Sequence, residues 1–210
     1  MRKEMGKAGV IAGGLVLVLC GAAFAQYPYQ YPYSAGVHSG SVGVKLIGFL
    51  PNSDSDGLKD FSTGIGIGVD SRYDFGDYFA LGVELDYIGV SSANEVYYDQ
   101  ATNAYYSYTE DFGSLALKLD ALGTIPLNNI IPFFGLGLVY NNSTFNDTYY
   151  GSTSGVGIGL ELVGGADFLM AGNGGITVEI SVPINQYSDF NGVSVNVGGI
   201  EVMAGYRFLF

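Results

Sequence analysis

From Ser41 to the last residue, apolar side chains alternate with polar or small ones at a period of two. In the stretch 176–182, four aliphatic residues alternate with Thr177, Glu179 and Ser181. Successive side chains of a strand point to opposite faces of a sheet, so this period is typical of β-structure. The pattern predicts eight strands, at 42–50, 64–73, 79–87, 115–121, 134–140, 156–167, 176–182 and 200–210.

The segments between these strands are alternately long and short. Long polar connections on one side and tight turns on the other are typical of up-and-down transmembrane barrels, which have an even strand count and both termini in the periplasm. A shift in the alternation near Gly198-Gly199 also predicts a β-bulge in the last strand. The long segments cover 51–62, 91–111, 141–154 and 185–192, and the short ones cover 74–77, 125–131 and 171–175.

The two faces of each strand suggest which one meets lipid. The apolar face is continuous, whereas the polar face is rich in glycine, which weakens a strand unless space is tight. The inner face of a narrow barrel needs small residues, and closure pairs every strand, as a bilayer requires. We therefore expect the apolar face outside; the alternative is a soluble barrel with an apolar interior. Aromatic residues expected to form a girdle at the membrane interface are Tyr73, Phe75, Phe79, Phe134, Phe168, Tyr206, Phe208 and Phe210.

The chain ends on an aromatic strand with no polar tail, in which Tyr206, Phe208 and Phe210 share one face. This ending resembles that of bacterial outer-membrane β-barrel proteins, which typically stop on Phe. The resemblance implies that these three residues form the signal read by the barrel-assembly machinery. Over residues 41–210 the pattern resembles the small OmpA/OmpX-type barrels. It implies an all-β fold, an eight-stranded antiparallel transmembrane β-barrel that is a monomer surrounded by bacterial outer-membrane lipid.

The first 25 residues have the features of a secretory signal peptide. A basic start precedes an apolar run over 8–22, and the motif Ala23-Phe24-Ala25 provides a cleavage site. A lipoprotein signal at Cys20 is an alternative, although such a site normally needs a small residue before the Cys and this chain has Leu19. An uncleaved membrane anchor is another alternative.

Residues 26–40 form a Tyr/Pro-rich segment, predicted to be a periplasmic linker before the barrel at 41–210. Removal of residues 1–25 takes away the only Cys, so no disulfide is expected. It also removes three of the eight basic residues and one of the 20 acids, which leaves 5 against 19 and a formal charge of −14. Such a surface makes nucleic acid an unexpected partner.

Four of the five basic residues that remain fall on the predicted inward face, together with eight acids. Charges in such a place persist by pairing or by contact with water. We expect an ion-pair and hydrogen-bond network, because eight strands leave an interior just wide enough for side chains. The excess of acids leaves a water-filled, cation-selective path as the alternative. The expected lumen network comprises Lys45, Asp70, Arg72, Glu84, Asp86, Lys118, Asp120, Glu161, Asp167, Glu179, Glu201 and Arg207.

Two long connections carry candidate ligand chemistry. Residues 52–57 match the first half of an EF-hand loop, but the twelfth position is Thr63 instead of Glu. We therefore expect a solvated acidic loop there and no bound calcium. The connection 91–111 is rich in tyrosine, which suits either packing at the membrane interface or an adhesive surface. Its tyrosines are Tyr97, Tyr98, Tyr105, Tyr106 and Tyr108.

Catalysis is not expected. The only histidine, His38, and the adjacent Ser39 precede the first strand, so no triad base lies inside the barrel. We also expect no metal or cofactor, because His and Cys clusters are absent from the sequence. The expected function is a structural or surface-interaction role through long extracellular loops, whose ligand the sequence leaves open. A narrow, cation-preferring, porin-like channel is the alternative.

Overall fold

The computed structural model describes residues 40–52, 58, 61–76, 78–91, 95–99, 103–108, 110–127, 129–147, 151–170 and 174–210. Within these ranges no helix is long and apolar enough to cross a membrane. The expected signal peptide lies outside the described residues, as does the linker apart from Gly40.

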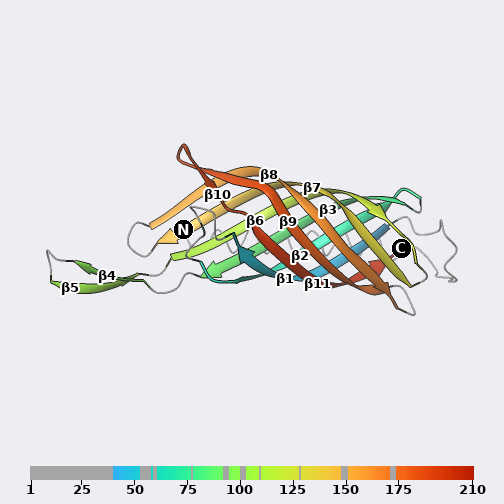
Figure 1. Cartoon of the computed structure of the whole chain (residues 1–210), viewed down its shortest axis with the longest axis horizontal. Helices are drawn as coiled ribbons and strands as arrows, with labels where there is room; N and C mark the ends of the chain where they lie inside the picture. Colours follow the sequence, from blue (N-terminus) through green and yellow to red (C-terminus); the bar gives the residue numbers. More distant parts are fainter. Residues whose placement is uncertain are drawn as a thin grey trace.

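Eleven strands form in this part of the chain, and eight of them close into an antiparallel barrel (Figure 1). Each barrel strand pairs with its neighbours in chain order, and β11 returns to pair with β1. The predicted eight-stranded up-and-down barrel is confirmed. Of the other three strands, β4 and β5 form a separate two-stranded sheet, and β10 pairs with β9. The barrel strands are β1 Gly40–Pro51, β2 Gly64–Asp74, β3 Phe79–Ser91, β6 Glu110–Thr124, β7 Ile130–Asp147, β8 Gly151–Leu169, β9 Gly174–Phe190 and β11 Gly199–Leu209; the short ones are β4 Glu95–Asp99, β5 Ala104–Tyr108 and β10 Val193–Asn196.

Closure turns the alternation of the sequence into an inside and an outside. Lys45 on β1 lies in register between Gly205 of β11 and Gly68 of β2. Its side chain is 1% exposed, whereas that of the next residue, Leu46, is 70% exposed. The same contrast repeats along the barrel strands, so the charged and glycine-rich face points into the lumen.

The two ends of the barrel differ. One end, called the loop end here, carries the connections β1–β2, β3–β6, β7–β8 and β9–β11. The other, called the turn end, carries the short connections and the C-terminus. The hairpin of β4 and β5 projects past the loop end, at the left of Figure 1, while the C-terminus lies at the right.

Three of the four expected long loops contain regular structure, so their prediction as loops is wrong over much of their length. β7 continues to Asp147 and β8 begins at Gly151, while β9 continues to Phe190 before β10. The segment 91–111 holds β4 and β5. Many positions in these extensions are polar on both faces, so a search for apolar alternation cannot reveal them, although their backbones pair in regular register.

The irregularity expected at Gly198-Gly199 also takes a different form. The chain passes there from β10 to β11, and the bulge lies between β8 and β9, where the register shifts after Leu160. Pro183 of β9 has no N–H to donate to a neighbouring strand. At the register shift, the Leu160 amide donates to the Asn185 side-chain oxygen at 3.1 Å. A side-chain acceptor thus satisfies the Leu160 N–H where the backbone pairing is irregular.

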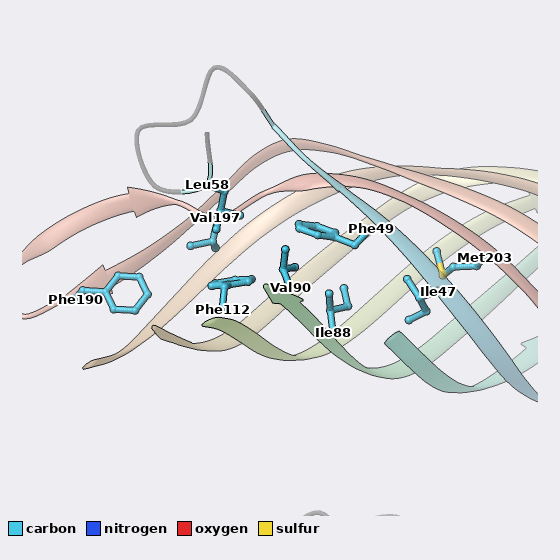
Figure 2. Packing of buried hydrophobic residues seen from close by; sticks show 9 residues of the cluster. All are labelled: Ile47, Phe49, Leu58, Ile88, Val90, Phe112, Phe190, Val197 and Met203. Carbon is cyan, nitrogen blue, oxygen red and sulfur yellow. The ribbon is translucent and has the colours of Figure 1, made fainter. Parts of the chain in front are cut away.

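The inner face is apolar toward the loop end, so the expectation of a polar interior is wrong there. Nine buried apolar side chains gather into one cluster inside the barrel, and Leu58 of the β1–β2 connection is fully buried among them (Figure 2). The Phe145 ring extends the packing and lies 5.1 Å from the Phe112 ring and 5.0 Å from the Phe190 ring. The cluster comprises Ile47, Phe49, Leu58, Ile88, Val90, Phe112, Phe190, Val197 and Met203.

Candidate functional site: the charged interior

The structure places all twelve charged residues of the expected lumen network inside the barrel, with exposed fractions of 0% to 7%. Seven of the eight barrel strands contribute at least one of them, because each strand turns alternate residues inward, and β7 contributes none. Charges this deeply buried are costly unless they pair. The arrangement of these charges therefore determines whether the lumen is held closed by ion pairs or leaves a path for ions.

Lys118 of β6 is surrounded by three carboxylates from three other strands. Its Nζ lies 3.0 Å from Asp86 Oδ2, 3.5 Å from Glu161 Oε2 and 2.5 Å from Glu201 Oε2. The Ser181 hydroxyl donates a further hydrogen bond to Glu161. One ammonium group therefore holds together β3, β6, β8 and β11 across the lumen.

A second group of charges centres on Arg72 and Arg207. Arg207 lies 2.7 Å from Asp70 and 3.3 Å from Asp167, and it donates to the Ser41 hydroxyl at 2.9 Å. Arg72 lies 2.9 Å from the other oxygen of Asp167 and 4.1 Å from the centre of the Phe133 ring. The aromatic face adds a cation–π contribution to the ion pair.

Lys45 links this second group to Glu84. Its Nζ forms ion pairs with Glu84 and, at 3.1 Å, with Glu179. Glu179 Oε2 also lies 4.0 Å from Arg72. The interior thus contains one connected network around three cations and a smaller one around Lys118.

Asp120 differs from the other seven carboxylates. Among the described residues it forms no ion pair within 4.0 Å, and its Oδ1 atom has no hydrogen-bond partner. Oxygens of Asp70, Glu84 and Asp86 are also buried without a hydrogen-bond donor. Arg207 Nε and Nη2 also lack a hydrogen-bond partner, although both form ion pairs. The acidic excess seen in the sequence persists in the lumen as carboxylate oxygens without a hydrogen-bond partner.

The glycines of the inner face make room for these carboxylates. Asp120 lies in register between Gly82 and Gly137, and Asp70 lies opposite Gly43. A Cβ added at Gly137 would come 2.5 Å from Asp120 Oδ1 and 2.9 Å from Glu161 Oε1. The charged side chains lie across the neighbouring strand, which leaves no space for a side chain there.

A neutral polar cluster lies between the charges and the loop end, and the sequence prediction missed it. Asn141 Nδ2 donates to the Ser188 hydroxyl at 3.0 Å and to the Ser143 hydroxyl at 3.2 Å. Ser143 is also 3.2 Å from the Ser114 hydroxyl. Asn141 and Ser143 fall within a segment expected to be a loop. Their spacing of two residues was the only available signal of a strand.

Aromatic residues mark both edges of the apolar outer surface. Seven of the eight residues expected to form a girdle are exposed by 40% to 62% and lie near the turn end, while Phe210 is half-buried. Near the loop end, Tyr87, Tyr140 and Tyr187 are exposed on β3, β7 and β9. From Phe79 to Tyr87, β3 covers about 27 Å along its axis, or roughly 20 Å across a membrane at barrel tilt. This height approaches the apolar band of known transmembrane barrels, about 25 Å.

The other candidate chemistry stays largely outside the described residues. No group of three or more His, Cys, Asp or Glu in the part of the chain that the structure describes could hold a metal ion. Of the EF-hand-like segment 52–57 only Asn52 is described, and His38 and Ser39 lie outside the described residues. The tyrosine-rich connection contains the β4–β5 hairpin.

The sequence of the chain matches a known family over nearly its whole length. The family model described as outer membrane protein beta-barrel domain matches residues 14–208. The chain belongs to this family. Its location is therefore the bacterial outer membrane, its exposed apolar band faces lipid, and the alternative of a soluble barrel is wrong. No curated protein sequence matches the chain.

Solved structures show the same fold at low identity. Neisserial surface protein A is 16% identical with a TM-score of 0.58, and the match covers 85% of this chain and 100% of that one. The outer membrane protein OprG from Pseudomonas aeruginosa is 14% identical with a TM-score of 0.56, and the match covers 82% of this chain and 97% of that one. At these identities the likeness concerns the fold alone.

Proposed function

We propose that this outer-membrane barrel is a closed scaffold with a surface-interaction role and no enzymatic activity. The observation that carries the proposal is the filled interior: all twelve lumen charges are at least 93% buried. The loop end faces the outside of the cell, as in other outer-membrane barrels with long external connections. The segments that extend past Tyr87, Tyr140 and Tyr187 at the loop end then carry the surface-interaction role.

The packing supports a barrel that does not conduct. Two successive layers obstruct its axis, because the ion-pair network spans the lumen and the nine-residue apolar cluster fills the loop end. An ion would have to cross an apolar constriction, where dewetting opposes passage. The Leu58 side chain, with no exposed surface, closes this layer from the β1–β2 connection.

The extensions beyond the membrane support a role at the surface. Past Tyr140, β7 continues for seven residues to Asp147, or about 24 Å. Its outward residues change there from aliphatic to polar, beginning with the exposed Asn142, and Thr144 lies 3.3 Å from Ser154 of β8. The paired strands of this extension, together with the β4–β5 hairpin, give the barrel a large external surface.

Deletion of the hairpin tests the role directly. Residues 95–108 are replaced by a short Gly/Ser linker, and folding is checked by the heat-dependent gel mobility shift of barrels. Cells that display either form are then incubated with an array of immobilised proteins and glycans. Selective retention of cells with the parent protein, lost on deletion, is the expected result. Equal retention of both forms on every surface would contradict the proposal.

A narrow, cation-preferring channel is the second candidate, because the lumen acids outnumber the bases by eight to four. Conductance of the purified protein in planar bilayers separates the two. We expect the parent protein to give no steady current. The channel would be established by a steady, cation-selective current of the parent protein. This current should disappear in a variant whose lumen Asp and Glu residues are replaced by Asn and Gln while Lys45 and Lys118 are kept.

A further inference from the structure

Basic side chains are nearly absent from the outer surfaces of this barrel. After residue 25 the sequence contains five Lys and Arg residues, and four of them are the buried cations of the lumen. Ion pairs hold these four inside, so none can meet a ligand at the cell surface. The fifth, Lys59, belongs to the β1–β2 connection and lies outside the described residues.

Acids, in contrast, gather at the loop end. Its connections and strand ends hold nine acids and one base, a formal charge of −8. Asp111 and Asp189 are exposed there, and Glu110 and Asp147 occupy opposite positions of β6 and β7. Like charges collected on one end add their potentials and steer the approach of charged partners. The nine acids are Asp54, Asp56, Asp60, Glu95, Asp99, Glu110, Asp111, Asp147 and Asp189.

The β4–β5 hairpin combines this charge with aromatic residues. It forms its own two-stranded sheet and pairs with no other strand among the described residues. Tyr97 lies opposite Tyr106, Tyr98 lies opposite Tyr105, and Glu95 begins the same hairpin. A lone two-stranded hairpin is only marginally stable in water. Contact with a partner would therefore stabilise it.

We propose that the β4–β5 hairpin docks a cationic polypeptide segment with exposed Lys and Arg side chains. The inference rests on the proposed surface-interaction role and names the chemistry of the partner. Tyrosine rings attract ammonium and guanidinium groups, and β4 also carries Glu95 and Asp99, which add opposite charge to the same hairpin. The surrounding acids repel polyanions, which excludes nucleic acids and sulfated glycans as partners.

A peptide titration tests the chemistry. The full-length protein is placed in nanodiscs of zwitterionic phosphatidylcholine and titrated with a fluorescent Lys/Ser peptide or a Glu/Ser peptide of equal length. We expect the Lys/Ser peptide alone to bind, with an affinity that falls as salt is added. The double substitutions Glu95→Gln/Asp99→Asn and Tyr97→Ser/Tyr106→Ser should each weaken binding roughly tenfold.

The matched control is Asp74→Asn/Asp77→Asn at the turn end. It removes the same charge as Glu95→Gln/Asp99→Asn but at the opposite end of the barrel, beyond the screening length of salt. Its effect should therefore stay within about twofold. An equal loss in the control would show that net charge alone attracts the peptide, which overturns the hairpin as the site. Binding of the Glu/Ser peptide would overturn the cationic partner.

The cell assay distinguishes failure of this inference from failure of the proposed function. If deletion of 95–108 abolishes retention of cells but Glu95→Gln/Asp99→Asn leaves it unchanged, the surface role stands and the cationic partner is wrong. If the deletion has no effect, both are wrong. The gel mobility shift of each variant confirms that the barrel has folded before either conclusion is drawn.

Discussion

Replacing Lys118 with Met should be the most damaging single change to the lumen. The substitution keeps the length of the side chain and removes its charge, so Asp86, Glu161 and Glu201 lose a cation that lies 2.5 to 3.5 Å from each. Removing one partner of a buried ion pair costs about 3–5 kcal/mol, because the remaining charge stays buried without compensation. We expect the free energy of unfolding to fall by this amount.

Removing an acid should have a much smaller effect. In Glu201→Gln, Lys118 keeps Asp86 and Glu161, and the excess of lumen acids over bases falls from four to three. We expect a change within about 1 kcal/mol in either direction. In the double variant, Glu201→Gln should recover part of the Lys118→Met loss, with a coupling of about 0.5–3 kcal/mol.

Urea titration in phospholipid vesicles measures these differences, with the heat-dependent gel mobility shift as the readout of folded barrel. All three variants and the parent are compared at one pH and one salt concentration. If Lys118→Met unfolds at the same urea concentration as the parent while Glu201→Gln loses several kcal/mol, Lys118 does not stabilise the barrel through its ion pairs.

A lumen glycine, a lipid-facing isoleucine and the two ends of the chain provide further tests of the fold. Gly137→Ala should destabilise the barrel by about 1–3 kcal/mol, since its Cβ would lie 2.5 Å from a carboxylate oxygen of Asp120. The control is Gly82→Ala, whose Cβ would lie 3.3 Å from the same carboxylate, and it should cost less than about 1 kcal/mol in the same urea titration. Ile180→Arg should cost about 2–4 kcal/mol by placing a charge toward lipid, and a neutral result would contradict the lipid-facing assignment. Phe210→Asp should block assembly but not synthesis; a variant that reaches the membrane and shifts on a gel like the parent would show that the terminal residue is not part of the signal. N-terminal sequencing of the membrane-extracted protein should begin after Ala25, whereas an intact N-terminus or a lipidated start would exclude cleavage there.

Alternation along the chain was sufficient to predict the number of barrel strands and the inward direction of the twelve lumen charges. Lys45 and Leu46 are neighbours with the same backbone, yet one is buried and the other is largely exposed. This inference works because the side-chain period of a strand is a local property, which the twist and closure of the sheet do not change. The glycines opposite the charges carried the same information, since only the crowded inner face needs them.

The partners of each charge, in contrast, depended on the tertiary structure. Lys118 meets Glu201, 83 residues later, because closure brings β6 and β11 to opposite sides of one narrow lumen. The sequence also could not show that Ile47, Phe49 and Phe112 would pack with Leu58 at the loop end. An apolar residue at an inward position only interrupts the expected alternation, and its role becomes clear once its neighbours in the fold are known. Alternation determines the side of the wall on which a residue lies. Strand register and barrel closure determine which residues it meets there, because they join positions that the chain itself keeps far apart.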